Sequence, residues 1–102
     1  MEEEFGRIID PSEVEAGAFR GGRWNYEGLA EALKTLFPKP KEGEVKGAEV
    51  LIEKILRYHE GELKNKAHYA KKAIEKAVKM NGWELVKIRT VGGKYVRFAV
   101  KF

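Results

Sequence analysis

The C-terminal end of the chain constrains the fold most, because it joins a long basic helix directly to a β-hairpin. Small and apolar residues recur at helical spacing over residues 64–80, which predicts one helix. Gly82 follows this stretch and suits the left-handed conformation that often ends a helix. The β-prone run 83–102 is divided by the glycine pair at 92–93, and such a pair between two β-prone runs indicates a hairpin.

The sequence leaves the register of this hairpin open. A two-residue turn at residues 92–93 places Leu85 on the apolar face. A three-residue turn at residues 91–93 shifts the register by one residue and places Ile88 there instead. In either register the cations of the hairpin lie in its outer half, towards the tip. They are Lys87, Arg89, Lys94 and Arg97.

Two further helices are predicted upstream. Residues 26–37 carry apolar side chains on one face, with Asn25 as the N-cap and Pro38 as the stop. Residues 45–60 show a similar apolar face and end at Gly61. The acidic outer face of this second helix should not lie on nucleic acid, because carboxylates repel phosphates.

These elements predict an α+β fold in a single domain, residues 1–102. Residues 1–25 are expected to form an N-terminal arm with a short turn, in which residues 5–9 can make a short strand. Residues 26–102 are expected to form a three-helix core with the C-terminal β-hairpin. A chain of 102 residues is long enough for one domain and too short for two.

The composition offers little for catalysis. There is no cysteine, which excludes disulfides, thiolate nucleophiles and cysteine-based zinc sites. The single serine, Ser12, follows a proline, and His59 and His68 have no third ligand at metal spacing. Glu84 and Lys87 are only a faint match to the carboxylate–lysine pair of metal-dependent nucleases. We therefore expect a protein that is not an enzyme and that holds no metal or cofactor.

Composition also bears on the origin and location of the protein. Many Lys and Glu residues with few thermolabile ones are typical of proteins from hot environments, although chance in a short chain is the alternative. No apolar run approaches the ~20 residues that span a bilayer, and the acidic N-terminus is unlike a secretory signal. A cytoplasmic protein is expected.

Charge is divided unequally along the chain. Residues 1–62 carry nine Lys/Arg and fourteen Asp/Glu, a net charge of −5. Residues 63–102 carry eleven Lys/Arg and two Asp/Glu, a net charge of +9, and the two parts agree with the total of +4. Such asymmetry favours a polyanionic partner for the positive part. The alternative is that the two parts attract each other, within one molecule or across a dimer.

The expected nucleic-acid interface combines polar residues of the third helix, cations of the hairpin and two arginines beside glycines in the arm. Asn65 and His68 have hydrogen-bonding ends that can read base edges, while the lysines and arginines would hold phosphates. The alternative is a set of solvated side chains. The expected contacts are Lys64, Asn65, His68, Lys71, Lys72, Lys76, Lys79, Lys87, Arg89, Lys94, Arg97, Arg20 and Arg23.

The order of these elements resembles the winged helix-turn-helix proteins over residues 26–102. The resemblance rests on element order and charge, since no diagnostic motif is present. It implies that residues 64–79 are a recognition helix and residues 89–94 the tip of a wing. The second and third helices are longer than that family's, and its short strand after the first helix is not evident. Many small archaeal and viral regulators have this fold.

The sequence therefore predicts a non-enzymatic DNA-binding protein, either a transcription regulator or a chromosome-associated protein, acting as a homodimer. Duplex DNA is favoured over RNA as the partner, and no membrane is expected to be involved. RNA binding within a ribonucleoprotein is one alternative, and a protein-interaction or assembly module is another. The sequence specifies neither a target sequence nor an effector ligand.

Overall fold

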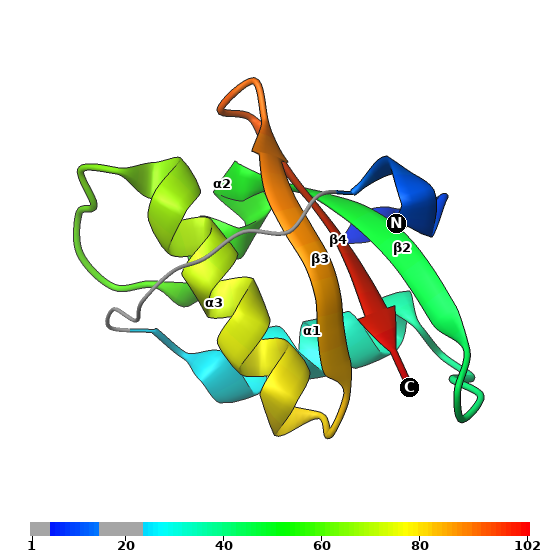
Figure 1. The fold of residues 1–102 in the computed structure, drawn as a ribbon. Helices are drawn as coiled ribbons and strands as arrows, with labels where there is room; N and C mark the ends of the chain where they lie inside the picture. The colour runs from blue at the N-terminus through cyan, green and yellow to red at the C-terminus, as the bar shows by residue number, and fades with distance from the viewer. Residues whose placement is uncertain (1–4, 15–23) are drawn as a thin grey trace.

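A four-stranded antiparallel sheet with the strand order β1-β2-β4-β3 forms the centre of the protein (Figure 1). The computed structural model describes residues 5–14 and 24–102. None of the helices in these two ranges has the length and apolar character needed to cross a membrane. The elements in chain order are β1 (Gly6–Ile9), η1 (Pro11–Glu13), α1 (Tyr26–Leu36), β2 (Val45–Leu51), α2 (Ile52–Ile55), η2 (Leu56–Tyr58), α3 (Lys66–Met80), β3 (Glu84–Val91) and β4 (Tyr95–Lys101).

The helix predicted for residues 45–60 is wrong, because its first half is the strand β2. This strand pairs with β1 on one side and β4 on the other, so the backbone groups on both of its edges are used. Gly47 would weaken a helix interior by about 1 kcal/mol relative to alanine. Only the two short turns α2 and η2 remain helical in this stretch.

The expected three-helix core with one hairpin is therefore wrong as a description of the fold. The protein is α+β, but four strands carry the architecture, and β2 lies inside the sheet between β1 and the hairpin. The short N-terminal strand is present, and it pairs with β2 rather than with the hairpin. The resemblance to winged helix-turn-helix proteins stays a prediction.

The hairpin adopts neither of the two registers considered from the sequence. Residues 92–94 separate its strands, and Val91 lies opposite Tyr95. The pairing shifts between Leu85 and Lys87, where Val86 is the extra residue of a β-bulge. The bulge turns both Leu85 and Ile88 towards the helices, so both candidate core residues are accommodated.

The main core lies between the sheet and the two long helices, α1 and α3, which cover the same face (Figure 1). Three alanines on the inner side of α3 are fully buried, and their small size allows the helix to approach its neighbours closely. Phe98 at the centre of the sheet is also fully buried, which is worth roughly 2–3 kcal/mol of stability. The side chain of Asn81 joins the ends of the helices by donating a hydrogen bond to the carbonyl of Ala30, 3.0 Å away.

Both long helices begin at asparagine caps. The side chain of Asn25 accepts a hydrogen bond from the amide of Gly28 at 3.0 Å, and α1 follows. The side chain of Asn65 does the same for His68 at 3.2 Å, and α3 follows. The first and third predicted helices are therefore confirmed, with small changes at their ends.

The opposite face of the sheet is partly covered by η1. Gly47 allows this close packing, since a Cβ there would meet the carbonyl oxygen of Ile9 at 2.8 Å and the Cα of Pro11 at 3.0 Å. Val14 follows η1 and is only 1% exposed. This layer places Glu13 within 3.6 Å of Arg97 on β4.

Candidate nucleic-acid interface

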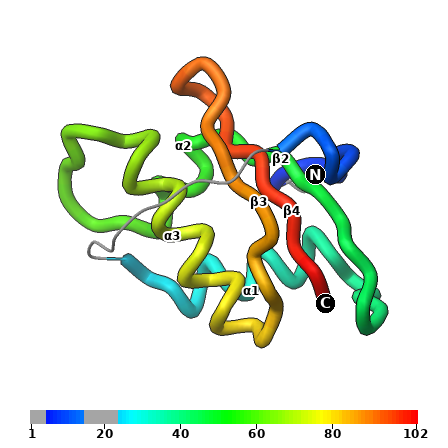
Figure 2. The backbone as a smooth tube through the Cα atoms, viewed as in Figure 1, coloured from blue at the N-terminus to red at the C-terminus, as the bar shows by residue number. Residues whose placement is uncertain are grey.

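The basic C-terminal part of the chain stays together in space. The helix α3 packs beside β3, which is an edge strand of the sheet. Figure 2 shows the helix running alongside this strand, with the hairpin tip projecting beyond it. The helix and the strand are therefore neighbours, but Lys87 and Arg89 alternate along β3 with the buried Ile88, so their side chains point to the face of the sheet opposite to α3.

Three lysines of α3 are exposed: Lys66, Lys76 and Lys79. Lys87 on β3 is half-buried. Within the described part of the chain, none of these four lies within ion-pair distance of a carboxylate. Their charges are thus not neutralised by the carboxylates placed around them, as a phosphate-binding surface requires. We call these four residues the lysine surface.

Several predicted contact residues of α3 are buried, or their side chains make contacts within the protein. Lys72 is only 5% exposed, with its ammonium 5.0 Å from the centre of the Tyr69 ring, so it does not belong to an open row of lysines. The oxygen of the Asn65 side chain is used in the helix cap, and the half-buried His68 ring packs edge-on against Tyr69. The expected interface on α3 therefore keeps lysines but loses the two residues that were expected to read base edges. Lys64 is exposed and Lys71 is half-buried.

The hairpin cations also differ from their predicted grouping at the tip. Lys94 is exposed in the turn, 5.9 Å from the Tyr95 ring. Arg89 lies opposite Arg97, on the edge strand β3 and away from the hairpin tip. Arg97 donates from Nε to Glu49 at 2.6 Å, so its charge is already used within the protein. Arg97 is therefore withdrawn from the phosphate-binding set.

These arginines belong to a row of charges that crosses all four strands. Arg7, Glu49, Arg97 and Arg89 are successive partners in the register of the sheet. Arg7 and Arg97 each hold one oxygen of Glu49, which is 4% exposed. Burial alone would raise the pKa of Glu49, but the hydrogen bonds from Arg97 and Arg7 outweigh it and lower that pKa. The bond to Glu49 raises the pKa of Arg97.

Arg89 is the uncompensated member of this row. Its Nε is buried and has no hydrogen-bond partner among the described residues. It also lies directly opposite another arginine, and like charges at opposed positions are destabilising. Arg89 therefore adds a positive charge to the face of the sheet that carries Arg97, opposite to the lysines of α3.

A row of aromatic rings lies beside α3. Tyr26 at the start of α1 stacks with Trp24 at a ring separation of 6.5 Å and an interplanar angle of 27°. Trp24 meets the ring of His59 edge-on at 4.8 Å, and the two residues form an isolated β-bridge. Lys76 of the lysine surface lies 5.7 Å from the Tyr26 ring at the other end. We call Tyr26, Trp24 and His59 the aromatic row.

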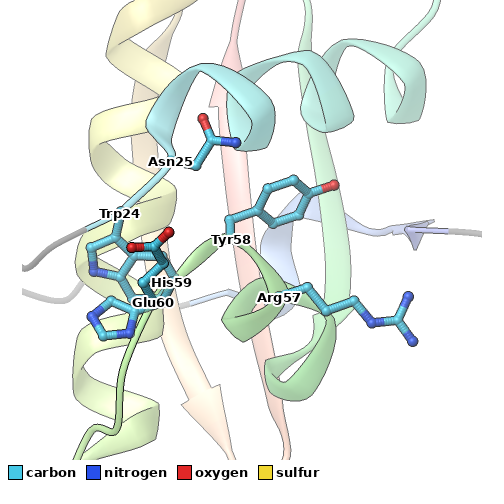
Figure 3. A pocket seen from close by; sticks show the side chains of 6 residues that line it. All are labelled: Trp24, Asn25, Arg57, Tyr58, His59 and Glu60. Atoms are coloured by element: carbon cyan, nitrogen blue, oxygen red, sulfur yellow. The ribbon is translucent and has the colours of Figure 1, made fainter.

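A hollow of about 490 Å³ opens at one end of the aromatic row, between the start of α1 and the residues after η2. Figure 3 shows the rings of Trp24 and His59 together on one side of it, with Tyr58 and Arg57 directed to the other side. Its lining residues are Trp24, Asn25, Arg57, Tyr58, His59 and Glu60. A second hollow of about 440 Å³ adjoins His59 and is lined partly by Lys66.

The indole of Trp24 has an unusual environment. Its Nε1 is buried and has no hydrogen-bond partner among the described residues. Leaving such a donor unpaired costs about 1–3 kcal/mol, a penalty that phenylalanine at the same position would not incur. Packing alone thus does not account for an indole here, whereas its large ring face suits stacking.

The sequence pointed to part of this arrangement. Arg20 and Arg23, the predicted contacts nearest to Trp24 in sequence, lie outside the described residues. The proximity of Tyr26 and His59 to Trp24 was not predicted. The only sequence signal was a tryptophan just before the helix cap Asn25, which cannot show that His59 pairs with it across the fold.

The fold and this surface define an α+β domain with a four-stranded antiparallel sheet, two long helices on one face, and cations gathered on α3 and β3. Comparisons with protein-family models, curated proteins and solved structures find no match for the chain. No group of three or more potential metal ligands occurs among the residues that the structure describes.

Proposed function

We propose that this protein binds nucleic acid without catalysing a reaction, and that the lysine surface holds the phosphate backbone. The observation that carries the proposal is the placement of Lys66, Lys76, Lys79 and Lys87 on adjoining elements, with no carboxylate partner among the described residues. Each lysine that meets a phosphate releases condensed counterions, which drives binding at low salt.

Duplex DNA remains the first candidate partner, and structured RNA is its alternative. Both present lines of phosphates, so phosphate contacts alone do not separate them. The burial of Lys72 and the use of Asn65 in a helix cap favour binding that depends weakly on sequence. Direct competition between a DNA duplex and an RNA hairpin at one salt concentration decides which is preferred.

The first test neutralises two exposed lysines of α3. The double variant Lys76→Gln and Lys79→Gln should weaken binding to duplex DNA roughly tenfold at low salt. The slope of log affinity against log salt should become shallower by about 1.8, because each lost phosphate contact contributes about 0.9. Fluorescence anisotropy with a labelled duplex, measured at several salt concentrations, gives both quantities.

The matched control is Lys39→Gln with Lys41→Gln, which removes the same charge from exposed positions in the loop between α1 and β2. This variant should keep the wild-type affinity and slope. Equal losses in the two variants would show that only net charge matters. Absence of binding to either DNA or RNA at low salt would refute the proposed function.

A further inference from the structure

The hollow beside the aromatic row calls for a partner different from the one that suits the lysine surface. Glu60 and Arg57 are both exposed on its lining, so their opposite charges leave the hollow without a net charge. The rings of Trp24 and His59, on the same side as Glu60, offer apolar contact to a flat ring. The hollow thus favours a planar, uncharged group over an anionic one.

We propose that this hollow receives one unpaired base of a bound DNA or RNA strand, stacked on the ring of Trp24 beside His59. The proposal rests on the nucleic-acid binding argued above and adds the form of strand that is bound. A volume of about 490 Å³ lies within the usual range of ligand sites and admits a single base. Bases stack on aromatic side chains whatever their identity, because each has a π-face.

The surroundings direct the strand into this position. Lys76 lies against the far end of the aromatic row, 5.7 Å from the Tyr26 ring. Lys66 lines the second hollow, which shares His59 with the first. A strand whose phosphates lie on these two lysines passes along the aromatic row, with one base turned towards Trp24. Rings flanked by cations in this way are typical of surfaces that bind single strands.

The test compares two probes of equal charge, a thymidine strand of about 10 nucleotides and an abasic strand of the same length. Wild-type protein should bind the thymidine strand about tenfold more tightly, because only that strand has bases to stack. The variant Trp24→Leu should bind the two strands equally. The variant Lys76→Gln with Lys79→Gln should bind both strands more weakly and keep the tenfold ratio.

A second measurement does not depend on the variant Trp24→Leu folding correctly. Trp83→Phe leaves Trp24 as the only tryptophan, since the chain has two. Fluorescence of this protein should fall when the thymidine strand binds and stay constant with the abasic strand. The reciprocal protein, Trp24→Phe, retains Trp83 in the cluster with Phe37 and Phe102 and should show no such quenching.

The outcomes separate this inference from the function on which it rests. The base-binding hollow would be overturned if the wild-type protein bound the two strands equally, or if the fluorescence of Trp24 did not change when the thymidine strand bound. Either result would leave phosphate binding intact. Failure of both strands to bind at low salt, where a DNA duplex or an RNA hairpin still binds, would overturn the base-binding hollow alone. Failure of the duplex and the RNA hairpin as well would overturn both. The same measurement with a uridine strand and an abasic RNA strand then shows whether RNA or DNA is preferred. The preferred nucleic acid is the one whose strand with bases binds more tightly.

Discussion

At the scale of single residues, Glu49 links the two strands that flank β2 in the sheet. Its carboxylate is held by Arg7 from β1 and by Arg97 from β4, while β2 carries it between them. Removing a buried charge that two arginines share leaves both without their acceptor. The arrangement therefore makes Glu49 a structural residue of the sheet rather than a member of a functional site.

The variant Glu49→Gln should lower the free energy of unfolding by about 2–3 kcal/mol at pH 7, the usual value of hydrogen bonds to a charged group. The pKa of Glu49 is lowered in the folded protein, so its contribution is present above the unfolded value, 4.5, and is lost as pH falls through the lowered value. The difference between wild type and variant should therefore shrink on acidification. Urea unfolding at a series of pH values measures it.

The control for this prediction is Glu31→Gln. Glu31 forms its ion pair with Lys34 at 3.5 Å, but both side chains are mostly exposed, at 73% and 54%. An exposed pair of this kind is worth at most about 0.5 kcal/mol on a helix. Similar losses from the two variants would contradict the structural role assigned to Glu49.

At the scale of elements, the strand β2 shows how tertiary pairing overrides a local pattern. Residues 45–60 carry apolar side chains at spacings that also suit a helix, and a helix was predicted. The strand is selected because β1 and β4 offer hydrogen-bonding partners on both sides. No local rule reveals those partners, since β4 is about fifty residues away in sequence.

Close packing of η1 on β2 depends on Gly47. The variant Gly47→Ala would place a methyl group against the carbonyl oxygen of Ile9 and the backbone of Pro11. Because backbone atoms must move, we expect a loss of roughly 1–3 kcal/mol in the free energy of unfolding. Hydrogen exchange should show reduced protection in β1, while α3 keeps its protection.

Gly93→Ala is the comparison for this change. Gly93 has a positive φ of 65° but open space around it, so alanine there is strained by its backbone alone. It should loosen the hairpin turn and leave β1 protected. If β1 keeps its hydrogen-exchange protection in Gly47→Ala as well, the close packing of η1 on β2 does not stabilise β1.

At the scale of the whole molecule, the strand order keeps the basic segment in one region. Because β3 is an edge strand with α3 beside it, Lys66, Lys76, Lys79 and Lys87 occupy adjoining elements. A different order could place β3 inside the sheet and separate these charges. The sorting of charge along the sequence thus becomes a sorting of charge in space.

This arrangement predicts the salt dependence of binding. If the four residues of the lysine surface each meet a phosphate, log affinity should fall against log salt with a slope of about −3.6 for duplex DNA. A single strand should give about −2.8, because each contact then contributes about 0.7. Two copies binding together, as the expected homodimer would, should double the slope, and sedimentation of the complex would show its mass. A slope near zero would contradict phosphate binding.

The sequence alone determined α1, α3, their asparagine caps, the existence of the hairpin and the concentration of positive charge near the C-terminus. These features depend on spacing, capping and charge within short segments, and local interactions suffice to produce them. The hairpin register was open because a bulge at Val86 satisfies two competing apolar patterns at once.

Only the tertiary structure decided that residues 45–51 form a strand, that Lys72 is buried, and that Trp24 meets His59. Each of these depends on a partner distant in sequence: neighbouring strands, surrounding surface or a facing ring. Whether a residue is paired or buried depends on that partner as well as on the residue itself. A local sequence pattern therefore does not predict it.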